Sequence, residues 1–222
     1  MILRPHHLPR IALSLLLTLG GLVHAAPEQW TKTIDAFTAK DRQDPPPHDG
    51  VVFVGSSSIV GWKTLADDFP GQQVINRGFG GSELADSVYY ADRIVLPYQP
   101  RIVVLYAGDN DLWAGKSPET VAADFKAFRE KIHAARPQTR IVYIAVKPSP
   151  SRWKIRDAMV RTNELIARQC AEDPRLRFVD IYTPMLNEKG EPRPELFLGD
   201  MLHMNRSGYE LWTKFVAPAL QP

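Results

Sequence analysis

Short apolar runs alternate with amphipathic segments along most of this chain. Five runs rich in β-branched residues have the character of buried strands, and they span residues 51–54, 74–75, 102–106, 140–146 and 177–180. Between the third and the fourth run, Val121, Phe125, Phe128 and Ile132 recur every three or four residues, which predicts one apolar face of a helix. Nearly continuous apolar strands separated by such helices favour an α/β fold, with a mostly parallel five-stranded sheet covered on both faces.

The boundaries of three helices can also be predicted. Ser117 is a suitable N-cap and Pro118 fits a first turn, so one helix is expected to begin there. Met159 to Cys170 repeats the apolar spacing, and a final helix is expected over residues 206–216. No long linker or internal repeat divides this part of the sequence, which indicates one domain.

The first 25 residues have the layout of a secretory signal peptide. Arg4 and Arg10 precede a short apolar run over residues 11–23, and small or apolar residues then occupy the positions that a signal peptidase reads. Cleavage is expected after Ala25, which leaves residues 26–222 as the folded domain. The run is shorter than the roughly 18–20 residues that span a bilayer, which argues against an uncleaved anchor. We therefore expect export to the periplasm or the medium, with no stable membrane anchor.

Removal of the signal peptide changes the charge balance. The full chain has 27 Lys and Arg against 25 Asp and Glu, and two of the arginines leave with the signal. Removing 25 of the 222 residues leaves 197, with 25 basic and 25 acidic side chains. A neutral domain lacks the basic excess that binds nucleic acid phosphates, so nucleic acid is not expected as a partner. Cys170 is the single cysteine of the sequence, which excludes an intrachain disulfide.

Small and polar residues follow each predicted strand. In a parallel sheet the carboxyl ends of the strands share one edge, and ligands bind beyond that edge. The segments in question are residues 55–58, 76–81, 108–111, 147–153 and the long loop that reaches residues 200–203. We therefore look for functional residues among them.

Asp200 and His203 are a candidate carboxylate and base. His203 is the one histidine on such a post-strand loop with a carboxylate three residues away. On one helical turn the two side chains share a face, so that Asp200 holds one imidazole N–H and leaves the other nitrogen as a base. An aspartate that caps the final helix beside a packed histidine would explain the same pair.

Three consecutive serines at positions 56–58 follow the first predicted strand. A serine hydroxyl becomes a nucleophile when a base removes its proton, and a serine at a helix start also offers its backbone amide to a developing oxyanion. Gly81 could supply a second amide, and Asn110 a side-chain amide as a third donor. Taken alone, these residues would equally suit a helix cap and two turns.

The four segments together resemble the four blocks of the SGNH hydrolases, also called GDSL-like esterases, lipases or acylhydrolases. The first and second blocks correspond to residues 53–59 and 76–81. Gly108 to Asp111 is a full match to the third block, G-x-N-D, and Asp200 to His203 matches the fourth, D-x-x-H. The blocks occur in the family's order, and the resemblance extends over residues 53–212, essentially the whole expected domain.

The resemblance implies a three-layer α/β/α sandwich of the flavodoxin-like SGNH hydrolase type and a serine esterase. It puts Ser57 at the nucleophile position, with Asp200 and His203 completing the triad, and it builds the oxyanion hole from the amides of Ser57 and Gly81 and the side chain of Asn110. One departure concerns Ser56, which stands where family members usually carry an aspartate and brings no charge.

Substrate residues are expected among the bulky side chains that flank the blocks. Five are candidates for the substrate pocket, although packing in the core or at the rim would explain each equally well: Trp62, Phe79, Trp113, Arg152 and Trp153. The chain has no room for a large lid, which favours small or soluble acyl esters such as acetylated sugars or lysophospholipids. Two alternatives use the same fold: a carbohydrate O-acyltransferase with the same triad, and a catalytically silent protein that binds carbohydrate or lipid.

Three competing motifs are weaker, and no cofactor or metal is expected. Gly115 to Ser117 resembles the end of a phosphate-binding loop, but the leading glycine of that motif would fall at Asn110. Residues 109–111 lack the glycine and the distal glutamate of a calcium loop. No second histidine or cysteine accompanies His203, as a zinc site would require.

Overall fold

A computed structural model describes residues 27–221 of the chain, and the expected signal peptide over residues 1–25 lies outside them. Five strands form one sheet in the order β2-β1-β3-β4-β5, and every neighbouring pair is parallel. The strands are β1 (Val51–Gly55), β2 (Val74–Gly78), β3 (Ile102–Tyr106), β4 (Arg140–Ile144) and β5 (Leu176–Val179). The predicted parallel five-stranded sheet is confirmed.

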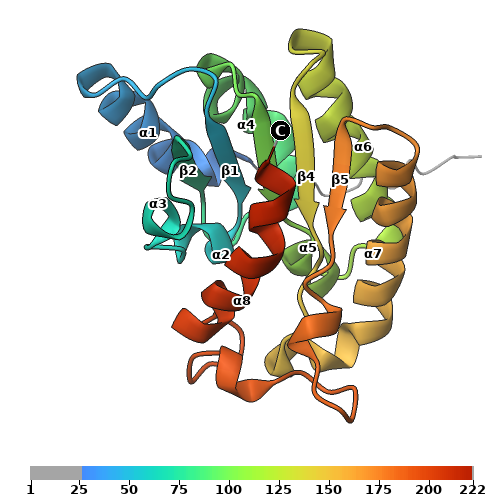
Figure 1. The fold of residues 1–222 in the computed structure, drawn as a ribbon. Helices are drawn as coiled ribbons and strands as arrows, with labels where there is room; N and C mark the ends of the chain where they lie inside the picture. The colour runs from blue at the N-terminus through green and yellow to red at the C-terminus, as the bar shows by residue number, and fades with distance from the viewer. Residues whose placement is uncertain (1–26, 222) are drawn as a thin grey trace, which may run out of the picture.

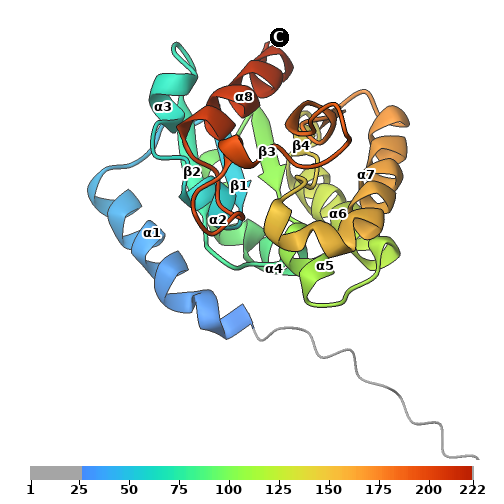
Figure 2. The same cartoon turned by 90° about the horizontal axis from the view of Figure 1, so that it is seen from below.

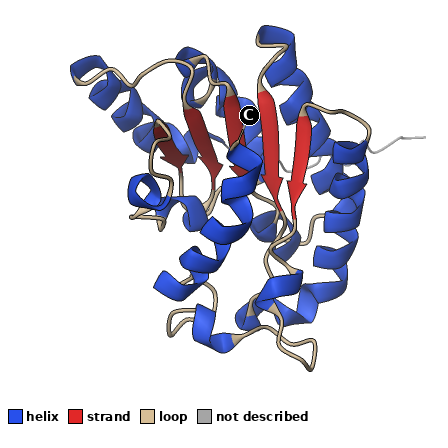
Figure 3. Ribbon diagram, in the orientation of Figure 1, coloured by secondary structure: helices blue, strands red, loops and turns tan. Residues whose placement is uncertain are grey.

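Helices cover both faces of this sheet, so that the domain has three layers (Figures 1 and 2). One face carries α1 (Thr31–Gln43), α4 (Leu84–Ile94), α6 (Pro118–Ala135) and α7 (Arg156–Ala171). The other carries α2 (Ser57–Val60), α3 (Leu65–Asp68) and α8 (Arg206–Val216). The arrowheads of the strands all point to the same edge of the sheet (Figure 3), so their carboxyl ends lie together there.

The apolar runs found in the sequence are buried because each strand contributes to two cores. In β1, Val52 and Val54 pack into the core under α1, α4, α6 and α7, whereas Val51 and Phe53 pack into the core under α8. All five residues of β1 are buried. Successive side chains of a strand point to opposite faces, and both faces of β1 are covered, so none of its side chains reaches solvent.

The observed element boundaries agree with most of the predicted ones. The Ser117 hydroxyl accepts a hydrogen bond from the backbone N–H of Thr120 at 3.1 Å, which confirms it as the cap of α6. The predicted end of the second strand at Ile75 is wrong, because Asn76, Arg77 and Gly78 also belong to β2 and pair with β1. No helix within residues 27–221 has the length and apolar character needed to cross a membrane.

Candidate active site

Segments that follow three strands meet the loop before α8 beyond the carboxyl edge of the sheet (Figure 1). They are α2 after β1, α5 (Asp109–Trp113) after β3, and the 3-10 helix η3 (Pro150–Ile155) after β4. The backbone N–H and the hydroxyl of Ser151 both donate to the carbonyl of Met201, at 3.1 and 2.9 Å. This contact fixes η3 against the loop that carries the predicted base.

Ser57 is the first residue of α2, and a tight turn after β1 brings it there. Gly55, which ends β1, has a positive φ of 145°, and a Cβ atom at this position would lie 1.9 Å from the carbonyl oxygen of Tyr106. Glycine is therefore required for the chain to turn so close to β3. As a first-turn residue, Ser57 has a backbone N–H with no partner inside its own helix.

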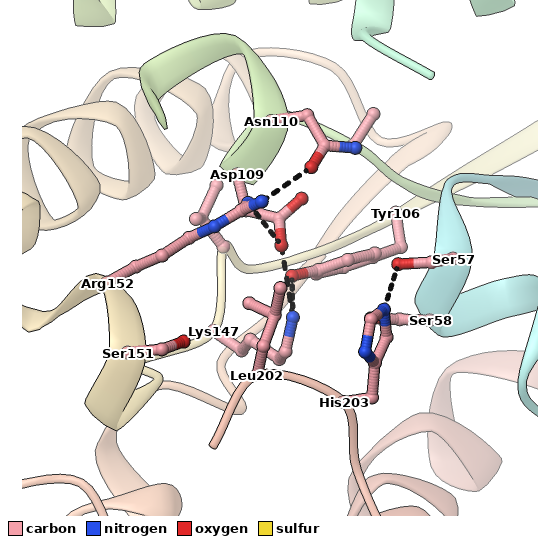
Figure 4. Close-up of polar contacts among 12 residues, drawn as sticks. Ser57, Ser58, Tyr106, Asp109, Asn110, Lys147, Ser151, Arg152, Leu202 and His203 are labelled. Carbon is pink, nitrogen blue, oxygen red and sulfur yellow. Dashed lines mark hydrogen bonds and ion pairs between the residues drawn. The ribbon is translucent and has the colours of Figure 1, made fainter. Parts of the chain in front are cut away.

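A chain of two hydrogen bonds joins Ser57, His203 and Asp200. The Nε2 atom of His203 lies 3.0 Å from the Oγ atom of Ser57 (Figure 4), and its Nδ1 atom lies 2.6 Å from Oδ2 of Asp200. The other carboxylate oxygen accepts the backbone N–H groups of Leu202 and His203, both at 2.9 Å. Asp200 is thus held in place by its own loop while it orients the imidazole.

These contacts keep Asp200 ionised. The hydrogen bond from the His203 side chain, together with those from the backbone N–H groups of His203 and Leu202, lowers the pKa of Asp200 to about 2. The side chains remain accessible, with 39% of His203 and 48% of Asp200 exposed. An ionised carboxylate favours the tautomer in which Nδ1 carries the proton and Nε2 can accept one from Ser57.

The structure distinguishes among the three consecutive serines. The hydroxyl of Ser57 faces the imidazole, whereas Ser56 and Ser58 are buried. Among the residues that the structure describes, the hydroxyls of Ser56 and Ser58 have no hydrogen-bond partner. The base therefore reaches the serine that the family resemblance singled out, and Ser56 adds neither charge nor a side-chain hydrogen bond beside it.

The two other predicted oxyanion donors lie in segments that follow β2 and β3, the two strands that pair with β1. Gly81 follows β2 with a φ of 80°, and a Cβ atom there would lie 3.3 Å from the ring of Trp30. The Nδ2 atom of Asn110 donates to the carbonyl of Ser82 at 2.9 Å, which links the second and third blocks. An amide nitrogen carries two hydrogens, so Asn110 retains one for a ligand.

A buried group of charges that the sequence analysis did not single out lies behind Asn110 (Figure 4). The Nζ atom of Lys147, whose side chain is 1% exposed, lies 3.0 Å from Oδ2 of Asp109 and donates to the Tyr106 hydroxyl at 3.1 Å. Burial alone would raise the pKa of Asp109, but Lys147 and Arg152 outweigh it and hold that pKa below its usual value. The sequence feature that could have predicted this buried charge is the position of Lys147 directly after the apolar run over residues 140–146.

Two of the five candidate substrate residues are core residues instead. Trp62 is 1% exposed and packs among the aromatic rings of the α8 core, and Phe79 is 0% exposed against Trp30 and Tyr90. Neither presents surface to a ligand, so the expectation that they line a pocket is wrong. Their nearness in sequence to the first and second blocks did not reveal that both side chains point inward.

The other three candidates lie on α5 and η3. Trp113 is 44% exposed, and its ring lies 4.3 Å from Nζ of Lys154 and 5.5 Å from Cζ of Arg152. Trp153 is partly exposed beside Arg156, whereas Arg152 itself is nearly buried. Trp113 is therefore the most exposed of these three candidates. Within residues 27–221, no group of three or more His, Cys, Asp or Glu side chains could hold a metal ion.

Residues 41–211 match the model of the GDSL-like Lipase/Acylhydrolase family, a span that includes Ser57, Asp200 and His203. The chain belongs to this family. As a GDSL-like acylhydrolase it is a carboxylic ester hydrolase, and the expected family and fold are confirmed.

Relatives of known name agree with this membership. Platelet-activating factor acetylhydrolase IB subunit alpha1 from Bos taurus is 28% identical over 194 residues, which cover 82% of this chain and 78% of the relative. The Homo sapiens protein of the same name gives the same identity and coverage. A GDSL-like lipase from Bacteroides thetaiotaomicron superposes with a TM-score of 0.70 at 24% identity, covering 84% of this chain and 96% of that one. At that identity the structural match shows that the two share a fold.

Proposed function

We propose that this GDSL-like acylhydrolase cleaves small acyl esters with Ser57 as nucleophile, His203 as general base and Asp200 as its orienting carboxylate. One observation carries the proposal: Ser57 Oγ lies 3.0 Å from His203 Nε2, and His203 Nδ1 lies 2.6 Å from the ionised Asp200. A serine is a poor nucleophile unless a base within hydrogen-bond reach takes its proton. Both distances meet that requirement without any movement of the chain.

The reaction follows from this arrangement in two halves. The Ser57 oxygen bonds to the ester carbonyl carbon while its proton moves to Nε2 of His203, and the carbonyl oxygen becomes an oxyanion. When the tetrahedral species collapses, the bond to the leaving alcohol breaks and the alcohol takes the proton from His203. Water then attacks the acyl-serine by the same route, which releases the carboxylic acid and restores the Ser57 hydroxyl.

The oxyanion is to be held by three donors: the backbone N–H groups of Ser57 and Gly81 and the free Nδ2 hydrogen of Asn110. The support is that Ser57 begins a helix and that the Asn110 amide is anchored by Ser82, with one hydrogen left over. Fixed donors are effective because they need no reorganisation as the charge develops.

The substrate class we propose is short acyl esters, including acetyl esters. The side chains of His203 and Asp200 are substantially exposed, so a small ester can reach the proposed base without displacement of a covering segment. Relatives at 28% identity are named as acetylhydrolases of platelet-activating factor, which favours a short acyl group. Acetylated sugars and lysophospholipids are the first classes to assay.

We also propose that the protein is exported, with a signal peptide over residues 1–25 cleaved after Ala25. The basis is the basic start, the short apolar run and the small residues before the proposed cleavage point. N-terminal sequencing of the protein recovered from the periplasm or the medium should begin at Ala26. Recovery with an intact residue 1 from the cytoplasm would contradict this.

A fluorophosphonate probe followed by peptide mapping tests the catalytic proposal. The probe should label the folded protein at Ser57, and the Ser57→Ala variant should take up no label while Ser56→Ala labels normally. Absence of label on the folded wild-type protein, or label on another serine, would overturn it. Acid release from p-nitrophenyl acetate, measured with and without a carbohydrate acceptor, separates hydrolysis from acyl transfer.

A further inference from the structure

Arg152 touches the proposed oxyanion residue and a buried ion pair at the same time (Figure 4). Its Nη2 atom donates to Oδ1 of Asn110 at 3.0 Å, and its Nη1 atom lies 3.3 Å from Oδ2 of Asp109. That same carboxylate oxygen accepts the ammonium of Lys147 at 3.0 Å. A connected line of side chains thus runs from the end of β4 to the amide of Asn110.

The contact with Arg152 fixes which way the Asn110 amide faces. A guanidinium can only donate hydrogen bonds, and the carbonyl of Ser82 can only accept them. Because Oδ1 accepts from Arg152 while Nδ2 donates to Ser82, a flip of the amide would put two donors together and two acceptors together. The orientation in which Nδ2 is the donating end is therefore enforced from both sides.

The charges behind Asn110 do not cancel. Lys147 and Arg152 contribute two cations and Asp109 one anion, all with little exposed surface, so the group carries a net positive charge next to the amide. Taking three charged side chains out of water is costly unless their geometry is well satisfied. A field of this sign favours an oxyanion over a neutral carbonyl, and a hydrogen bond to Oδ1 polarises the Nδ2 hydrogens.

We propose that Arg152 is a positioning residue that holds the Asn110 amide in its donating orientation, with Asp109 and Lys147 anchoring the guanidinium. The inference rests on the proposed function, in which Asn110 binds the oxyanion. It also replaces the expectation that Arg152 lines the substrate pocket, because the guanidinium is nearly buried and already bound on two sides. Arg152 acts through Asn110 and contacts neither Ser57 nor His203 in the hydrogen bonds and ion pairs of residues 27–221.

The test is a double-mutant cycle between Arg152 and Asn110, with kcat and KM measured separately on p-nitrophenyl acetate. Arg152→Met should lower kcat about 10- to 100-fold and change KM less than about threefold, because the loss falls on the transition state. In the Asn110→Ala background, Arg152→Met should cost less than about threefold, since its target is gone. Arg161→Met, which removes an exposed arginine of α7 that pairs with Glu119, should keep the wild-type values.

Two further measurements separate positioning from a folding defect. Arg152→Lys keeps a cation beside Asp109 but lacks the branched guanidinium that contacts both Asn110 and Asp109. Its folding stability should therefore be close to that of wild type, whereas its kcat should lie between those of wild type and Arg152→Met. The midpoint of the acid limb of kcat/KM should be the same in wild type and Arg152→Met, because the His203–Asp200 pair is untouched.

Three outcomes would overturn the inference. They are an unchanged kcat in Arg152→Met, a rise in KM at constant kcat, and an equal loss of kcat in the presence and absence of the Asn110 side chain. The Ser57→Ala variant distinguishes this failure from that of the proposed function. If Ser57→Ala is inactive while Arg152→Met is fully active, the role of Arg152 is refuted and the triad stands; if Ser57→Ala is active, the triad itself is refuted.

Discussion

The imidazole Nε2 of His203 lies 3.0 Å from the hydroxyl of Ser57, across a sequence separation of 146 residues. The two residues belong to different segments at the carboxyl edge of the sheet, one directly after β1 and the other just before α8. Their meeting depends on the parallel arrangement of the strands, which brings post-strand loops from the whole domain to one edge. The same edge holds Asn110 and Arg152.

The first prediction concerns the three adjacent serines. Ser57→Ala should lower ester hydrolysis by at least about 10⁴-fold, because it removes the nucleophile. Ser56→Ala and Ser58→Ala are matched controls: each removes a buried hydroxyl that has no partner in residues 27–221, so each should stay within about tenfold of wild type. The measurement is the steady-state rate of p-nitrophenyl acetate hydrolysis by wild type and the three variants. A normal rate for Ser57→Ala beside an inactive Ser56→Ala would reassign the nucleophile.

The second prediction concerns Asp200 as the orienting carboxylate. Asp200→Asn keeps the shape of the side chain but removes its charge and allows the wrong imidazole tautomer, so kcat should fall about 10³- to 10⁴-fold. Asp157→Asn on α7 is the control, since that carboxylate is exposed far from the base in sequence and should be dispensable. A loss below about tenfold for Asp200→Asn would mean that His203 is oriented by other contacts.

The third prediction concerns pH. A histidine base works in its neutral form, so kcat/KM should fall as pH decreases from about 7 to 5. Because hydrogen bonds from His203 and Leu202 hold the pKa of Asp200 at about 2, this carboxylate stays ionised throughout that interval and does not cause the loss. A pH–rate profile on an ester with a non-titrating leaving group measures it. A flat profile across the interval would argue against His203 as the base.

Much of this site followed from the sequence because it is encoded in short local patterns. Small or polar residues follow each strand, so the four blocks and their order can be read from the sequence. Asp200 and His203 are three positions apart, so the sequence also predicts that their side chains lie on the same face of a turn. The sequence did not predict whether the aromatic side chains that flank the blocks point into the core or toward the site. Trp62 and Phe79 adjoin the blocks along the chain, but the direction in which each ring points depends on packing against elements distant in sequence.

The buried charges were missed for a related reason. Asp109 and Lys147 are 38 residues apart, and each taken alone looks like an ordinary polar residue at the end of a strand. Only the pairing of β3 with β4 brings them within 3.0 Å of each other. Contacts between charged residues in segments that follow neighbouring strands have no signature in a single sequence, whereas a motif within one loop does.

The fourth prediction compares the contributions of buried Trp62 and exposed Trp113 to the free energy of unfolding. Trp62→Ala should lower the free energy of unfolding by about 3–5 kcal/mol, because it removes a large side chain from a packed aromatic core. It also leaves Asp68 without the Trp62 Nε1 donor, which lies at 2.7 Å. Trp113→Ala, at an exposed position, should cost less than about 1 kcal/mol. Urea denaturation gives both values, and equal effects would contradict the assignment of Trp62 to the core.

The fifth prediction concerns Asp111, which follows Asn110 and accepts the backbone N–H of Leu84 through both carboxylate oxygens, at 3.1 and 3.2 Å. Burial raises the pKa of Asp111 from 3.8 to about 7, even though Lys116 and the Leu84 N–H act in the opposite direction. Between these two pH values the native state holds a proton that the unfolded state has lost. Raising the pH through this interval therefore favours unfolding, with a slope of up to about 1.4 kcal/mol per pH unit.

Asp111→Asn removes this dependence while its side-chain oxygen can still accept from Leu84. Relative to the variant, wild type should lose stability as the pH rises from about 4 to about 7, and the difference should level off above that range because both states are then deprotonated. The measurement is the free energy of unfolding in urea at a series of pH values for both proteins. A wild-type free energy of unfolding that stays constant relative to that of the variant, or that rises relative to it as the pH rises, would show that Asp111 is ionised in the native state near neutral pH and is stabilised there by Lys116.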